Sequence, residues 1–201
     1  MTTSATRDGL AGLLRRIAAE LRPDWRTVTV LGVAAAPWAV WVSGPSPASP
    51  AFVVAALSGS ALGVIDARTQ RLPNALVYPT FGVVGLLLAG AAVGTGAWAD
   101  LARAGMGALA PSVVYLVLHL IDARSLGLGD AKLMLVVGTL AGWHSWQLVL
   151  WSGVMPFLLG GVCALALLVT RRAGLQAMLP FGPFILIGAA TALTLARLVH
   201  V

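Results

Sequence analysis

Apolar stretches long enough to cross a membrane recur along most of this chain, and its polar residues gather between them. A transmembrane α-helix needs about 20 consecutive residues that are mostly apolar. The 201 residues are 59% hydrophobic and only 10% charged, and their mean hydropathy is +0.91. Soluble domains carry about 25% charged residues. We therefore predict an all-α polytopic membrane protein.

The apolar stretches also set the expected number of helices. Seven segments have the composition of a span, and boundary errors of several residues allow six to eight. The second segment is marginal and the fifth is short, so one of them extends beyond its apolar residues or crosses a locally thinned bilayer. The expected spans are residues 27–42, 51–65, 75–94, 101–121, 131–143, 148–170 and 181–199.

The first 26 residues have a different character. In the stretch LAGLLRRIAAELRP, apolar residues recur at helical spacing and are interrupted by Arg15, Arg16 and Glu20. This pattern is typical of an amphipathic helix that lies on the membrane surface with its arginines toward lipid headgroups. No cleavable signal peptide is evident. We predict a cytoplasmic N-terminal segment, residues 1–26, followed by a membrane-embedded domain, residues 27–201.

The basic residues predict the orientation of the bundle. If the N-terminus is cytoplasmic, seven spans place eleven basic residues inside and two outside, in agreement with the positive-inside rule. We therefore expect a multi-pass protein of the cell (plasma or inner) membrane, in contact with lipid. The inner residues are Arg7, Arg15, Arg16, Arg22, Arg26, Arg68, Arg71, Arg124, Lys132, Arg171 and Arg172, and the outer ones are Arg103 and Arg197.

Charge and cysteine content argue against two other classes of protein. The net charge is +6, but the arginines sit in short loops and form no stripe with interleaved aromatics, so no nucleic-acid partner is expected. The single cysteine, Cys163, lies inside an apolar run and permits neither an intrachain disulfide nor a Cys-x-x-Cys zinc site. We expect neither a metal ion nor an organic cofactor.

Three of the seven acidic residues lie where apolar runs meet polar loops. The letters Ile-Asp-Ala-Arg occur twice, with Asp66 in the first copy and Asp122 in the second. Asp130 follows eight residues after Asp122, at the start of the next apolar run. With the predicted topology, all three carboxyl groups lie at the cytoplasmic end of the bundle.

The segment around Asp130 reads Gly127-Leu-Gly129-Asp130-Ala-Lys132. Two glycines ahead of an acid allow close approach of another backbone and turn conformations that bulkier residues disfavour. Asp130 is predicted to be the N-cap of the fifth span, where free amides and the helix dipole favour its ionised form. Gly127 and Gly129 are expected to shape the loop, and Lys132 is close enough in sequence to hold the acid ionised.

The segment after Asp66 ends in Arg71-Leu72-Pro73-Asn74. Pro73 disfavours helical backbone at Leu72, and Asn74 is a good N-cap for the third span, so a sharp turn between antiparallel helices is predicted. Asp66 is expected at a helix C-terminus, where the dipole disfavours its ionised form, whereas Arg71 favours it. If the second and fifth spans pack together, Asp66 and Asp130 face each other.

Two carboxyl groups in one site cannot both ionise without a large free-energy cost. One keeps its proton, so the pair can activate water and hydrogen-bond a carbonyl oxygen, which is the division of labour of an aspartic peptidase. The helix-end argument makes Asp130 the general base and Asp66 the acid. These roles belong to a coupled pair and can exchange during the reaction.

Together the motifs resemble those of the type IV prepilin peptidase family, a group of GxGD-type intramembrane aspartic peptidases. The similarity is carried by Asp66 with Arg71-Leu-Pro-Asn74, and by Gly127-x-Gly129-Asp130-x-Lys132-Leu133 about sixty residues later. It covers about residues 51–199, and Pro180-Phe-Gly-Pro-Phe184 is similar to a further motif of the family.

The resemblance implies that Asp66 and Asp130 are the catalytic pair. It implies cleavage of the basic leader of prepilin-like or pseudopilin substrates at the cytoplasmic membrane face, just before a hydrophobic N-terminal helix, with roles in type IV pili or protein secretion. Members that also N-methylate the new N-terminus often carry paired Cys-x-x-Cys motifs near their own N-terminus. Residues 1–50 contain no cysteine, so we expect a short form without methyltransferase activity.

Other readings stay open on sequence alone. Asp122 lacks both flanking motifs and is expected to cap its helix or to pair with Arg124. His119 could bond to Asp122 at i−3 or be a packed core histidine. Acids inside a helix bundle also mark ion pathways, so a proton- or ion-coupled transporter is an alternative. A non-catalytic assembly partner of a pilus or secretion system is another.

Overall fold

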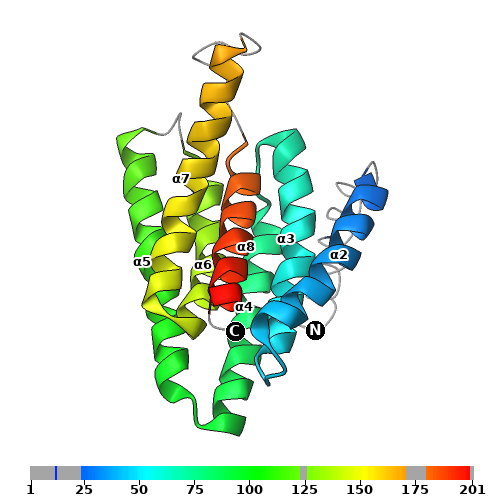
Figure 1. Cartoon of the computed structure of the whole chain (residues 1–201), viewed down its shortest axis with the longest axis vertical. Coiled ribbons are helices and arrows are strands. Elements are labelled where there is room, and N and C mark those ends of the chain that lie inside the picture. Colours follow the sequence, from blue (N-terminus) through cyan, green and yellow to red (C-terminus); the bar gives the residue numbers. More distant parts are fainter. Residues whose placement is uncertain (1–11, 13–23, 123–125, 171–179, 200–201) are drawn as a thin grey trace, which may run out of the picture.

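The chain folds into a bundle of long helices that run in alternating directions (Figure 1). The computed structural model describes residues 12, 24–122, 126–170 and 180–199, and within these ranges the regular structure is entirely helical. The predicted amphipathic helix falls almost entirely outside the described residues. The helices are α2 (Trp25–Ser43), α3 (Ser49–Thr69), α4 (Asn74–Thr95), α5 (Trp98–Ile121), α6 (Leu128–His144), α7 (Trp146–Val169) and α8 (Gly182–Val199).

The all-α polytopic membrane class is confirmed. In the described part of the chain, five helices are long and apolar enough to cross a membrane, namely α3, α4, α5, α7 and α8. The second predicted span, which looked marginal, is part of the 21-residue α3, because the helix continues past the apolar run to Thr69. The fifth remains short, since α6 has only 17 residues.

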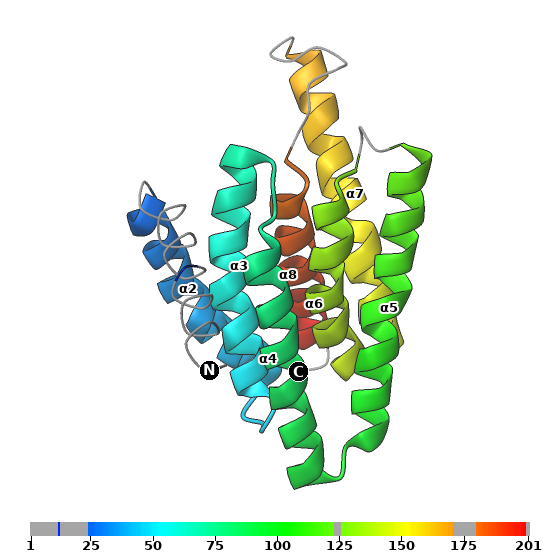
Figure 2. The same cartoon turned by 180° about the vertical axis from the view of Figure 1, so that it is seen from behind.

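The short helix α6 is the centre of the bundle (Figure 2). It packs against α3, α4, α5, α7 and α8. Eleven of its 17 residues are buried, including Asp130 at one end and Gly142 at the other. A helix shielded by its neighbours needs no lipid-facing surface along its whole length, which explains how a short helix is accommodated.

Glycines bring α5 and α6 into backbone contact. A Cβ atom added at Gly138 would lie 2.1 Å from the carbonyl oxygen of Gly107, and one added at Gly142 would lie 2.7 Å from that of Arg103. Close packing of small residues is a principal source of helix association in lipid, where no hydrophobic driving force acts between helices. This interface fixes the position of α6, and with it that of Asp130, relative to α5.

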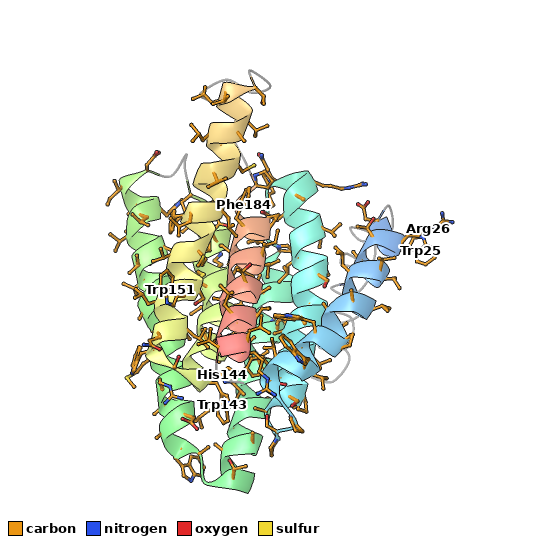
Figure 3. All side chains as sticks on the ribbon, in the orientation of Figure 1. Trp25, Arg26, Trp143, His144, Trp151 and Phe184 are labelled. Carbon is orange, nitrogen blue, oxygen red and sulfur yellow. The ribbon has the colours of Figure 1, made fainter. Side chains whose placement is uncertain are left out.

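The C-terminus of α6 is held from α5 by Arg103. Its guanidinium group donates to the carbonyl oxygens of Gly142, Trp143 and His144, and forms an ion pair with Asp100. These carbonyl groups end a helix and would otherwise lack partners. Figure 3 shows Trp143 and His144 at this end of the bundle, far from Phe184 near the start of α8.

Small residues on α3 fix its contact with α8. Cβ atoms added at Gly59 and Gly63 would lie 3.2 and 3.0 Å from the side chain of Leu186. Asp66 follows Gly63 by three residues and therefore lies on the same face of α3. The start of α8, one helical turn before Leu186, is thus placed against Asp66.

Candidate active site

The end of α3 and the start of α6 lie at the same end of the bundle, the upper end in Figure 1, and these segments carry Asp66 and Asp130. Asp66 lies in the last turn of α3 and Asp130 in the first turn of α6, and the two helices pack together. Both side chains are buried, with 5% and 6% exposure. The two carboxyl groups are close enough for their charges to interact. The arrangement therefore places two carboxyl groups in one water-poor environment.

Each carboxyl group is oriented by one backbone amide. The amide of Gly182, at the start of α8, donates to Oδ2 of Asp66 at 2.9 Å. The amide of Gly127 donates to Oδ2 of Asp130, also at 2.9 Å. Each acid therefore has one oxygen in a described hydrogen bond, so its second oxygen can serve in chemistry.

The position of Asp130 within its helix differs from the prediction. The N-cap of α6 is Gly127, and Asp130 is the third helical residue. Its carboxyl group reaches back to the Gly127 amide, whereas an N-cap side chain would accept from an amide ahead of it. The helix begins earlier because the backbone of Leu128 and Gly129 is already helical, with Asp130 N–H bonded to the Gly127 carbonyl at 3.1 Å.

The turn after Asp66 packs onto the start of α6. Helix α3 ends at Thr69, Gln70 adopts a left-handed backbone with φ 51°, and α4 begins at Asn74, as the turn prediction required. A Cβ atom added at Gly129 would lie 2.9 Å from Cβ of Leu72. Gly129 is therefore needed for the close approach of this turn, and Gly127 would similarly crowd Asp130 if it carried a side chain.

Lys132, Asn74 and Arg71 lie on the rim of this region. Nζ of Lys132 donates to Oδ1 of Asn74 at 2.9 Å and lies 5.7 Å from the ring centroid of Tyr78. Asn74 is thus the first residue of α4 and accepts from Lys132, while the N-cap is Pro73, contrary to the prediction. The side chain of Arg71 is exposed. Lys132 and Asn74 link α6 to α4 beside the two acids.

Asp122 is placed differently from Asp66, although both belong to an Ile-Asp-Ala-Arg copy. It is the exposed C-cap of α5, whereas Asp66 is inside α3 and buried. The position of Asp122 at the helix end is the one predicted, and Arg124, its other predicted partner, lies outside the described residues. The repeat therefore marks one end of two helices and not two equivalent site residues.

Three residues near the acids were not predicted from the sequence to be part of the site, although His119 was considered as a partner of Asp122. Gly182 touches Asp66, and the only signal for it was its place in the Pro-Phe-Gly-Pro-Phe motif. Tyr115 and His119, one turn apart on α5, interact electrostatically with Asp130. Polar residues inside an apolar span are a general sign of function or internal hydrogen bonding, which is the signal that could have found them.

An aromatic cluster borders the site on the side of α7 and α8. Phe181 lies 5.1 Å from Phe157 and 6.3 Å from both Tyr115 and Phe184, measured between ring centroids. The hydroxyl group of Tyr115 donates to the carbonyl oxygen of Gly153 at 2.9 Å. These rings keep the environment of the acids apolar, which strengthens electrostatic interactions there.

Two other kinds of site, a metal site and a large cavity, were compared with the region around the acids. In the described part of the chain, no group of three or more His, Cys, Asp or Glu residues could hold a metal ion. A cavity of about 760 Å³ lies at the opposite end of the bundle, lined by His144, Trp151 and Arg197 among others, and neither acid lines it. Proximity to the paired carboxyl groups, and not cavity size, identifies the candidate site.

A family model and individual relatives of known description point to the same family of proteins. Residues 51–195 match the model of the type IV leader peptidase family. The chain is 30% identical over 191 residues to a prepilin leader peptidase/N-methyltransferase of Burkholderia pseudomallei, covering 92% of this chain and 59% of that protein. A protein of the same description from Pseudomonas putida is 30% identical over 152 residues, covering 73% of this chain and 50% of that protein.

The chain therefore spans only half to three-fifths of the length of these relatives. No solved structure gives a significant match. The matched region contains Asp66, Asp130 and Gly182, the residues that meet at the upper end of the bundle.

Proposed function

The chain belongs to the type IV leader peptidase family, and we propose that it is a membrane aspartic endopeptidase that removes the basic leader of prepilin-like or pseudopilin substrates. The catalytic pair in this proposal is Asp66 and Asp130. Arg71, Pro73, Asn74, Gly127, Gly129 and Lys132 shape the site or contact the substrate.

One observation carries the proposal. Two buried carboxyl groups from separate, packed helices lie at the same end of the bundle, and each accepts a hydrogen bond from a backbone amide. Purely structural acids at helix ends are usually solvated or paired with a cation. No described salt bridge involves Asp66 or Asp130. Burial without a cation is therefore better explained by chemistry than by helix stability.

The pair has the groups that peptide hydrolysis needs. The ionised carboxylate takes a proton from water, and the water oxygen attacks the scissile carbonyl carbon while the protonated carboxyl group donates to the carbonyl oxygen. The C–N bond then breaks, and the leaving nitrogen receives a proton from the pair. The protons belong to both acids together, so base and acid need not be fixed to one residue.

The position of the pair suits a substrate that is itself a membrane helix. Both acids lie at helix ends, so a substrate helix beside the bundle would present its scissile bond at the membrane surface. The described basic residues Arg26 on α2, Arg68 on α3, Arg71 in the turn after α3 and Lys132 on α6 lie at this end, which supports a cytoplasmic orientation. The N-terminus would then be cytoplasmic.

The experiment is leader removal from a co-expressed prepilin. Wild-type protein is compared with Asp66→Asn and Asp130→Asn, each of which keeps an oxygen that can accept the observed amide hydrogen bond. Loss of the processed band in both variants, at unchanged protein level in the membrane, is the expected result. Asp122→Asn is the matched control and should process normally.

Two results would contradict the proposal. Processing that survives both Asp66→Asn and Asp130→Asn would exclude the pair from catalysis. Loss of processing in Asp122→Asn alone, with the protein folded, would mean that a different acid is the second member of the pair. A transporter would instead show ion flux that depends on the pair and no change in prepilin length.

A further inference from the structure

His119 contacts the backbone just before α6. It lies on α5, two residues before the end of that helix, and is partly buried. Its Nδ1 atom is 2.7 Å from the carbonyl oxygen of Leu126. A carbonyl oxygen can only accept, so Nδ1 carries a proton and donates. This contact crosses from α5 to the segment before α6 and differs from the bond to Asp122 considered from the sequence.

The acceptor of this hydrogen bond shares a peptide group with the amide that holds Asp130. The carbonyl of Leu126 and the N–H of Gly127 are the two ends of one planar unit. At one end Nδ1 of His119 donates, and at the other end the Gly127 amide donates to Oδ2 of Asp130 at 2.9 Å. Fixing the carbonyl therefore fixes the direction of the amide.

The two hydrogen bonds also reinforce each other. Donation to a peptide carbonyl polarises the group and makes its N–H a better donor. The imidazole thus acts on the carboxyl group of Asp130 through a hydrogen-bonded peptide.

Apart from the hydrogen bond between the Asp130 N–H and the Gly127 carbonyl, few contacts of the described residues constrain this peptide. The side chain of Leu126 is buried, with 4% exposure, but Gly127 and Leu128 are exposed. Glycine has wide backbone freedom, so the 126–127 peptide can rotate if nothing holds its carbonyl. Rotation would turn the Gly127 amide away from Asp130.

We propose that His119 is a positioning residue for the peptidase reaction, which holds the carboxyl group of Asp130 in its working orientation through the Leu126–Gly127 peptide. This inference rests on the proposed function. His119 moves no proton itself, and any side chain that donates at the place of Nδ1 can replace it.

The test compares three variants of the full-length protein in detergent, with a purified prepilin as substrate. His119→Asn keeps a donor near the place of Nδ1, whereas His119→Leu and His119→Phe keep apolar volume and remove the donor. We expect kcat to fall about 5- to 10-fold in the Leu and Phe variants, the effect of losing one hydrogen bond. KM should change by less than about twofold, because substrate contacts are intact. His119→Asn should restore most of kcat.

The control and the contrary results separate this inference from the proposed function. Leu120→Ala changes a neighbouring side chain that is 75% exposed, and it should leave kcat unchanged. Wild-type kcat in the Leu and Phe variants would overturn the positioning role, as would an Asn variant as slow as they are, or a rise in KM alone. If the Leu variant does not fold, the Phe and Asn variants decide. Absence of cleavage by the wild-type protein would instead overturn the proposed function, and this inference with it.

One readout does not depend on activity. In ¹⁵N-histidine-labelled protein, NMR should show His119 with its proton on Nδ1, and the signal should be the same in the inactive Asp130→Asn variant. A neutral ring protonated on Nε2 alone would contradict the hydrogen bond on which the inference depends.

Discussion

Replacement of Gly182 by alanine tests the contact that joins α8 to Asp66. The Gly182 amide donates to Oδ2 of Asp66 at 2.9 Å. A Cβ atom at this position would lie 2.6 Å from the same oxygen and 2.9 Å from the carboxyl carbon, and Cβ atoms essentially never show separations under 3.0 Å. Either the carboxyl group must rotate or α8 must move away, and both break the hydrogen bond.

The size of the effect follows from that bond. Asp66 belongs to a pair whose acid and base roles can exchange, and a hydrogen bond to a carboxyl group contributes about 1.5–3 kcal/mol while that group is ionised. If the bond orients Asp66 in the transition state, its loss lowers kcat about 10- to 150-fold, at about 1.4 kcal/mol for each factor of ten. The assay is the initial rate of prepilin cleavage by purified Gly182→Ala protein, with thermal unfolding measured in the same detergent.

The matched control is Gly161→Ala on α7, where an added Cβ meets nothing within 4 Å. It makes the same chemical change, and we expect its rate to stay within about twofold of wild type, because alanine is the better helix former. A folded Gly182→Ala protein that cleaves as fast as the Gly161→Ala control would refute the reasoning. Asp66 would then not depend on the α8 amide for its orientation.

Three further predictions concern the packing around the site. Gly129→Ala places a Cβ atom 2.9 Å from Cβ of Leu72 and should lower the cleavage rate. Leu72→Gly in the same protein removes that Cβ and should restore part of the rate, and a double variant no faster than Gly129→Ala would contradict the contact. Gly138→Ala places a Cβ atom 2.1 Å from the Gly107 carbonyl oxygen and should destabilise the protein by about 3 kcal/mol or more in a denaturation assay. The control is Gly90→Ala, whose added Cβ atom meets nothing within 4 Å, and it should not destabilise the protein. Lys132→Met and Asn74→Ala each remove the same exposed hydrogen bond, so each should lower the free energy of unfolding by at most about 1 kcal/mol. The double variant should lower it by less than the sum of the two single effects. Full additivity would show that the bond contributes nothing to stability.

The positions of the helices were largely predictable, and the reason is the lipid environment. Apolar length and intervening polar residues predict helices closely because backbone groups in a bilayer must be satisfied within the helix. The turn at Pro73 was also predictable, since proline restricts the residue before it. The starts of α4 and α6 were placed on the wrong residues, because Asn74 and Asp130 have side chains that suit an N-cap but bond elsewhere.

The sequence by itself determined the class of protein, the end of the bundle where the acids gather and the two motifs that carry the family resemblance, because these depend on local composition and spacing. Only the tertiary structure decided what each acid touches. The Gly182 amide that holds Asp66 is 116 residues away in the chain, and the His119 contact depends on how α5 packs on α6. Such pairings follow from the fit of small residues between helices, as at Gly107 and Gly138. Glycines four residues apart, such as Gly138 and Gly142, mark a packing face in the sequence, but they do not say which helix packs there.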